Sequence, residues 1–169
     1  MSDFPRPVAL AKINSDGLVA RVQASERECA ALAERMGIPA VLSLECLFEL
    51  TREDDGGSIR AEASLRAAVV RECIVTAEDF ETPVEEEFTV RFVPSGQETD
   101  NPDPDLPDEI PYDGDTIDLG EAAAEQLALT LDPYPRIEGA TVPDLEDDET
   151  PASPFEALSR LSPPDRTRH

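Results

Sequence analysis

Five carboxylates stand close together in the second half of the 169-residue chain and could do metal chemistry. They are Asp113, Asp115, Asp118, Glu121 and Glu125. Hard divalent cations prefer carboxylate oxygens, so a metal-dependent nuclease or hydrolase using carboxylates 113–125 is one alternative. Their spacing does not match a calcium loop, and acids also gather at helix N-termini because of the helix dipole. We therefore expect helix capping and a solvated face, with no metal and no other cofactor.

Histidine and lysine, which many nucleophilic and acid–base sites use, are scarce, with one of each in the chain. The one histidine is His169, the last residue given, whereas a catalytic triad needs an imidazole that neighbouring groups orient. No Gly-rich phosphate-binding loop with a lysine is present. Cys29 and Cys46 fall in apolar patterns and are expected to be core thiols, while Cys73 follows a predicted strand. We therefore predict that the protein is not an enzyme.

Three arginines, Arg60, Arg66 and Arg91, could form a local basic patch. The first two share the polar face of one predicted strand, and the third lies on a neighbouring strand. Such a patch could contact phosphate, which makes direct rRNA binding an alternative function. The interpretation that we favour is cross-strand pairing with carboxylates. The carboxylates considered are Glu45, Glu49, Glu62 and Glu87.

The charge of the whole chain argues against nucleic-acid binding driven by bulk charge. There are 14 Lys and Arg against 38 Asp and Glu, a formal net charge of −24. Residues 92–159 hold one Arg and 19 of the acids. Such a surface repels phosphate and anionic membranes alike. The acidic stretch 98–118 is either a solvated loop or a surface that holds a basic partner such as a ribosomal protein.

The sequence also predicts where the protein resides. No apolar run approaches the roughly 18 residues of a membrane span, and no signal peptide is visible at the N-terminus. We therefore expect a cytoplasmic protein whose three cysteines are reduced. The oligomeric state is left open.

Local signals predict the first elements that position these residues. Ser25 and Glu28 fit a capping box, and apolar residues follow at helical spacing, which predicts a helix over 26–36. The short apolar segments 7–13 and 18–24 flank a turn sequence of Asn, Ser, Asp and Gly. That turn chemistry predicts a first hairpin.

Apolar and polar residues then alternate, which is typical of strands with one buried face. The predicted strands are 42–50, 59–69 and 84–92. Residues 72–82 are expected to be a turn or kinked connection. The helix over 26–36 is expected to cover the apolar side of the sheet.

The second half of the chain contains fewer elements. Residues 95–111 are expected to be a long, mobile acidic loop. Asp118 can cap a second principal helix that has Glu121 at its third position. Residues 136–169 are acidic and Pro-rich and are expected to be a flexible tail, with a short helix near 154–161.

These elements predict an α+β fold. It consists of an antiparallel β-sheet of about five strands, packed with two principal helices. One domain is expected over residues 1–135, followed by the tail.

Three separate blocks of the sequence resemble one known family. The first is residues 71–94, with Cys73 and Phe80 followed by alternating apolar residues. The second is the acidic turn and helix of residues 110–135, and the third is the Ser-Pro-Phe-Glu-Ala-Leu ending at 153–158. In order and spacing they resemble the YceD family, the large ribosomal RNA subunit accumulation proteins of bacteria and plastids, and most closely its alphaproteobacterial branch.

The resemblance implies a non-enzymatic ribosome-biogenesis factor that supports accumulation of large-subunit (23S-type) rRNA. Many members of the family have Cys-x-x-Cys in the central signature, a pattern associated with zinc. Here Cys73 keeps the first position and Thr76 occupies the second. One thiolate is too few for a structural zinc site, which takes four ligands, so we expect no zinc.

A large-subunit ribosomal protein or a pre-ribosomal particle is the expected partner, since an acidic protein is attracted to a basic surface. The acidic loop would attract it, and the short helix would dock in a groove of the partner. The candidate partner-binding residues are Phe155, Leu158, Leu161, Asp115, Asp118 and Glu121.

Overall fold

A computed structural model describes residues 2–54, 56–99 and 105–141 of the chain. Over these residues the fold is α+β, as predicted, with a five-stranded sheet, a separate pair of short strands and two α-helices. The sheet has the order β2-β3-β4-β5-β6. Its strands are β2 (Leu18–Gln23), β3 (Ala40–Arg52), β4 (Ile59–Glu72), β5 (Asp79–Pro94) and β6 (Asp108–Tyr112). The short pair is β1 (Pro7–Ala9) and β7 (Thr116–Asp118), and the helices are α1 (Glu26–Met36) and α2 (Leu119–Thr130).

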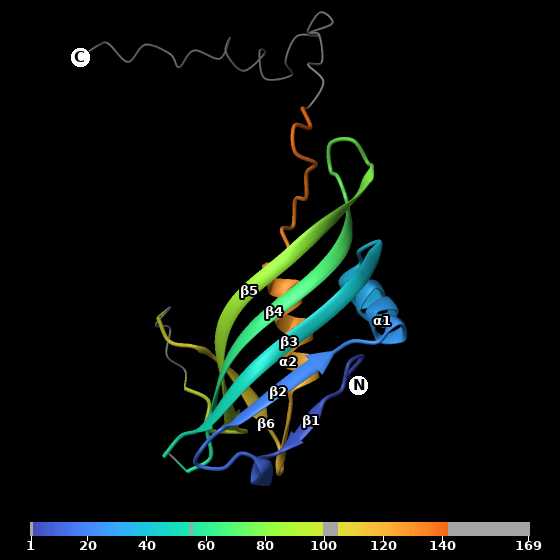
Figure 1. The fold of residues 1–169 in the computed structure, drawn as a ribbon. Helices are drawn as coiled ribbons and strands as arrows, with labels where there is room; N and C mark the ends of the chain where they lie inside the picture. The colour runs from blue at the N-terminus through green and yellow to red at the C-terminus, as the bar shows by residue number, and fades with distance from the viewer. Residues whose placement is uncertain (1, 55, 100–104, 142–169) are drawn as a thin grey trace, which may run out of the picture.

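The three long strands β3, β4 and β5 form the centre of the sheet (Figure 1). Neighbouring strands from β2 to β5 are antiparallel, and buried and exposed residues alternate along β4. The predicted strands are therefore confirmed, and all three extend further than predicted. Because β4 continues to Glu72 and β5 begins at Asp79, the predicted connection over 72–82 is reduced to residues 73–78.

The predicted first hairpin is wrong. The turn forms, since the Gly17 N–H donates to the Asn14 carbonyl at 3.0 Å, but the segments around it join different sheets. β1 pairs with β7, more than 100 residues away, while β2 pairs with β3. Turn residues reverse the direction of the chain, but they do not determine which strand each flanking segment pairs with. β1 could therefore pair with the distant β7 instead of with β2.

The predicted loop over 95–111 is wrong at its end, where β6 begins. β6 runs parallel to β5, with Phe92 opposite Ile110. β6 is an edge strand, and an edge position tolerates Pro111, which has no N–H to donate to a neighbour. Alternation over so few residues, with Pro107 just before the strand and Pro111 within it, gives too weak a strand signal to recognise in the sequence.

Both of the predicted principal helices are confirmed. α1 has its capping box, in which Ser25 accepts from the Glu28 N–H and Glu28 accepts from the Ser25 N–H at 2.8 Å. α1 ends at Gly37, whose φ of +64° favours glycine. α2 has Asp118 as its N-cap, accepting from the Gly120 and Glu121 N–H groups at 3.0 and 3.1 Å.

Most of the buried residues form one hydrophobic core between the inner face of the sheet and the two helices. α2 lies behind the sheet in Figure 1, while α1 packs against β3. Phe48 of β3 and Phe88 of β5 meet edge to face, with ring centroids 6.0 Å apart. The opposite face of β3, β4 and β5 has no helix on it among the described residues, so its side chains meet solvent. Neither α1 nor α2 is long and apolar enough to cross a membrane, and the described residues contain no other candidate.

Candidate functional site

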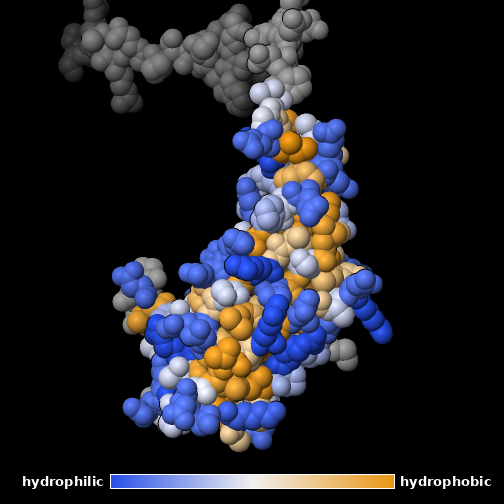
Figure 2. Space-filling view, in the orientation of Figure 1, coloured by the Kyte–Doolittle hydropathy of each residue, from blue (hydrophilic) through white to orange (hydrophobic). Residues whose placement is uncertain are grey.

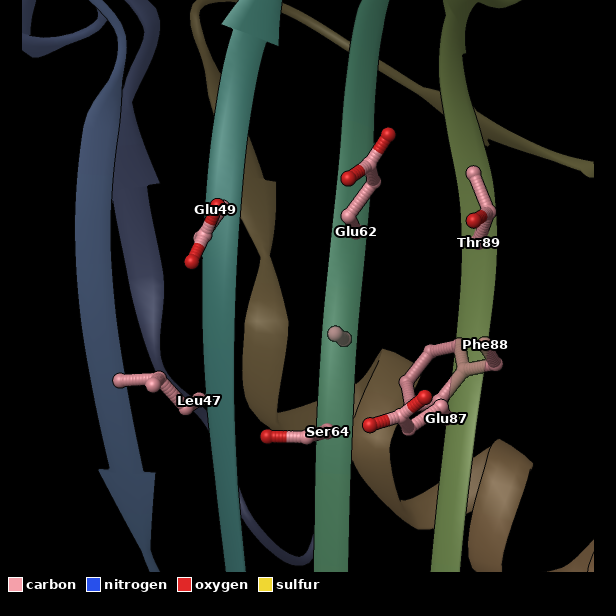
Figure 3. Close-up of a pocket in the computed structure, with 8 residues that line it drawn as sticks. Leu47, Glu49, Glu62, Ser64, Glu87, Phe88 and Thr89 are labelled. Carbon is pink, nitrogen blue, oxygen red and sulfur yellow. The ribbon is translucent and has the colours of Figure 1, made fainter.

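The uncovered side of β3, β4 and β5 is hollowed. The hollow has a volume of about 440 Å³. Figure 3 shows the side chains around it on the three strands, with α2 behind them. We call it the acidic hollow; it is lined by Leu47, Glu49, Glu62, Ala63, Ser64, Glu87, Phe88 and Thr89.

The register of the strands brings three glutamates to the acidic hollow. Glu49 of β3 lies directly opposite Glu62 of β4, and Glu62 lies opposite Thr89 of β5. Two residues away along each strand, on the same face, Leu47, Ser64 and Glu87 form the next row across the sheet. Like charges at directly opposed positions repel each other, so the Glu49–Glu62 pair is unfavourable in the isolated chain.

Ion pairs on the same face neutralise some carboxylates but not all. Arg60 pairs with Glu62 at 3.2 Å, and Arg66 pairs with Glu85 at 3.5 Å. Within the described part of the chain, Glu49 and Glu87 have no ion pair or side-chain hydrogen bond. The hollow therefore presents two carboxylates without an internal cation.

The arginines proposed as RNA contacts do not form one patch. Arg60 and Arg91 are opposite each other on β4 and β5, whereas Arg66 is six residues further along β4, about 20 Å away. Arg91 is 25% exposed and pairs with Glu53 at 2.6 Å and Glu109 at 2.9 Å. Arg66 is 76% exposed and is the most accessible of the three.

The carboxylates around the start of α2 are divided between exposed positions and internal contacts. Asp113 and Asp115 are exposed in the turn between β6 and β7. Asp118 caps α2 and also accepts from the Arg6 N–H at 2.9 Å. Arg35 forms two hydrogen bonds with Glu121 and thereby lowers the pKa of that carboxyl. No group of three or more His, Cys, Asp or Glu among residues 2–54, 56–99 and 105–141 is arranged to hold a metal ion.

Cys73 occupies a buried turn between β4 and β5. The Thr76 hydroxyl donates to its sulfur, as does the Ile137 N–H at 3.4 Å, and these hydrogen bonds lower the pKa of the thiol to about 7. Thr76, at the position of the second cysteine of Cys-x-x-Cys, therefore stabilises the Cys73 thiolate. By contrast, burial in the core raises the pKa of Cys46 to about 12.

The remaining candidates from the sequence, Phe155, Leu158 and Leu161, lie outside the described residues, as does the short helix expected near 154–161. The acidic hollow is not evident in the sequence, where Glu49, Glu62 and Glu87 are expected only as partners of arginines. The available signal was the recurrence of glutamate on the outward row of three strands. Figure 2 shows hydrophilic and hydrophobic residues interleaved over the face seen in Figure 1.

Comparison with known proteins gives one family. The family of the large ribosomal RNA subunit accumulation protein YceD matches residues 61–162, a range that begins at the third residue of β4. No curated protein and no solved structure matches the chain. The match covers more than half of the 169 residues. It includes the turn of Cys73, the acidic turn before α2 and two strands of the acidic hollow. The chain belongs to the YceD family of large ribosomal RNA subunit accumulation proteins.

Proposed function

We propose that the protein is a non-enzymatic ribosome-biogenesis factor that binds a basic large-subunit ribosomal protein or a pre-ribosomal particle. Membership of the YceD family supports a role in ribosome biogenesis, and the family is not known as one of enzymes. The observation that carries the choice of partner is electrostatic. Arg60, Arg66 and Arg91 all form ion pairs with the protein's own carboxylates, in a chain of net charge −24.

A basic protein partner suits this charge distribution better than RNA does. Opposite charges accelerate encounter and suppress wrong partners, whereas phosphate would meet the unpaired Glu49 and Glu87 on the same face as the arginines. Asp115 is exposed and free to contribute. The Asp118 carboxylate already accepts from backbone N–H groups of α2, and the Glu121 carboxylate already pairs with Arg35. Both are therefore expected to contribute less than Asp115 to binding a partner.

The acidic loop and the tail complete the proposal. Residues 98–111 attract the partner, and Phe155, Leu158 and Leu161 supply apolar anchors for a groove on it. Deletion of 98–107 and 153–161, which spares β6, should weaken capture of the partner. Unchanged capture would remove both segments from the proposal.

The decisive experiment is an affinity pull-down of the tagged full chain from lysate at moderate salt, with and without RNase. We expect large-subunit ribosomal proteins to stay bound after RNase treatment. A catch of large-subunit rRNA that disappears with RNase would instead favour direct rRNA binding. In that case binding to an rRNA fragment should weaken steeply with salt and respond to Arg66→Gln, since phosphate contacts release counterions.

A further inference from the structure

We propose that the acidic hollow is a docking surface for an extended, arginine- or lysine-rich segment of a protein. This inference rests on the proposed function, because it names the surface that receives the basic partner. It places a contact on the folded sheet, separate from the acidic loop and the tail.

The first argument is that this sheet face is open and uneven rather than flat. The hollow has a volume of about 440 Å³ and is open to solvent, which gives room for side chains of a bound segment. Leu47, which is 39% exposed, forms an apolar wall, and Ser64 and Thr89 supply hydroxyls. Such a mixture suits a side chain with an aliphatic stem and a cationic head.

The second argument is charge complementarity. Glu49 and Glu87 have no ion pair among the described residues, and Glu49 also faces Glu62 across the strands. A cation beside Glu49 would pair with that carboxylate and reduce the part of its repulsion with Glu62 that Arg60 leaves. Since neither Glu49 nor Glu87 has a cation of this chain paired with it among the described residues, the hollow is suited to a cationic ligand.

The geometry of the sheet indicates how such a segment would be spaced. Glu49 and Glu87 are two strands apart and offset by two residues, so their backbones lie about 12 Å apart. In an extended chain, residues four apart are separated by about 13 Å and point to the same side. A segment whose cations include two that are four residues apart can therefore present one to each carboxylate, and a segment with a cation at every second position meets this condition.

Other occupants fit less well. A second copy of this chain would place the same glutamates against themselves, and a nucleic acid would bring phosphate to them. A metal ion would need ligands that converge, and no such group occurs in the part of the chain that the structure describes. A basic protein segment is the occupant that satisfies both the charge and the apolar wall.

The test uses the full chain and a synthetic twelve-residue peptide of alternating arginine and alanine, blocked at both ends. The variant Glu49→Gln/Glu87→Gln removes the two unpaired carboxylates with almost no change of shape. Glu34→Gln/Glu72→Gln is the matched control, because it removes the same charge from exposed positions on α1 and at the end of β4. Thermal melting checks that both variants are folded.

Isothermal titration at fixed salt should show that the hollow variant binds the peptide about tenfold more weakly than the control variant, as expected for loss of two exposed charge contacts. In amide NMR spectra the peptide should shift residues 47–49, 62–64 and 87–89 most. Equal weakening in both variants, or shifts concentrated elsewhere, would overturn the proposal.

The RNase-treated pull-down separates this inference from the proposed function. Loss of ribosomal-protein capture by the hollow variant, with capture retained by the control, would support both. If both variants capture ribosomal proteins as well as the unmodified chain, the hollow is not the docking surface and the proposed function stands. If the unmodified chain captures no ribosomal protein, the proposed function fails. The peptide titration then still shows whether the acidic hollow binds a basic segment.

Discussion

At the scale of single residues, Glu28 links two parts of the chain. Its two carboxylate oxygens accept from Arg6 Nη1 and Nη2 at 2.8 and 2.9 Å, and one of them also accepts from the Ser25 N–H. These contacts lower the pKa of Glu28 from 4.5 to about 2, with the hydrogen bond from Arg6 as the largest cause. One side chain thus completes the cap of α1 and holds the N-terminal segment against it.

Glu28→Gln should destabilise the protein at pH 7 by about 1 kcal/mol, because it removes the charge that pairs with Arg6 and completes the cap. The Glu28 side chain is 21% exposed, so solvent screens part of that interaction. Because the folded pKa lies below the unfolded one, the contribution of Glu28 is complete above about pH 4.5. It is lost as the pH falls through about 2. The difference in unfolding free energy between the two proteins, measured by urea denaturation from pH 7 to pH 2, should therefore shrink. A difference independent of pH would show that Arg6 does not bind the charged form.

Cys73 gives a second prediction at this scale. Thr76→Val removes the hydroxyl that stabilises the thiolate and should raise the pKa of Cys73 from about 7 towards its ordinary value of 9.0. Thiolate absorbance near 240 nm, followed as the pH rises, measures this titration. Cys73→Ser is the control that identifies the signal, because Cys29 and Cys46 have raised pKa values. If the unmodified protein and Thr76→Val titrate with the same midpoint, the lowered pKa of Cys73 would be due to the backbone N–H groups instead.

At the scale of elements, the start of α2 is packed unusually closely by the N-terminal segment. A Cβ on Gly120 would lie 1.7 Å from the Phe4 carbonyl oxygen, which is a backbone atom that cannot rotate away. Phe4 is fully buried, and the Leu119 N–H donates to the Arg6 carbonyl at 3.1 Å. The segment before β1 is therefore held on α2 from several directions.

Gly120→Ala should destabilise the protein by about 2 kcal/mol or more, because the N-terminal segment must shift. Helix propensity alone predicts the opposite sign, since alanine is favoured over glycine by about 1 kcal/mol. Ala128→Gly, at an exposed position of the same helix, isolates that propensity. Chemical denaturation of both variants measures the two effects, and a stabilising Gly120→Ala would contradict the close contact.

At the scale of the whole molecule, self-repulsion follows from a net charge of −24. The ion pairs on the sheet face are mostly exposed, with Arg66 and Glu85 each 76% exposed, and such pairs contribute little to stability. Repulsion should therefore outweigh them when salt is low.

The Tm should rise by several degrees between roughly 20 and 300 mM KCl, because the Debye length shortens and the repulsion is screened. Scanning calorimetry at constant pH measures it. A sucrose series gives the effect of an added solute that does not screen charge. A falling Tm would mean that the surface ion pairs dominate.

Signals carried by neighbouring residues were readable in the sequence. The capping box of Ser25 and Glu28, the stop at Gly37 and the cap at Asp118 involve groups within a few residues of each other, and α1 and α2 begin where predicted. Period-two alternation likewise identified the long strands, since a strand with one buried face must alternate. The sequence by itself determined these elements, the excess of negative charge and the family resemblance.

Pairing between distant segments was decided only by the tertiary structure. β1 joins β7 rather than β2, and β6 joins β5 in parallel, because these choices depend on which backbone edges and apolar faces meet in the folded chain. The acidic hollow is of the same kind: the sequence shows its glutamates, but only the register sets Glu49 against Glu62 and leaves Glu87 without a cation. The sequence shows which residues are charged, whereas most of the ion pairs on this face join different strands or segments and so depend on the tertiary structure.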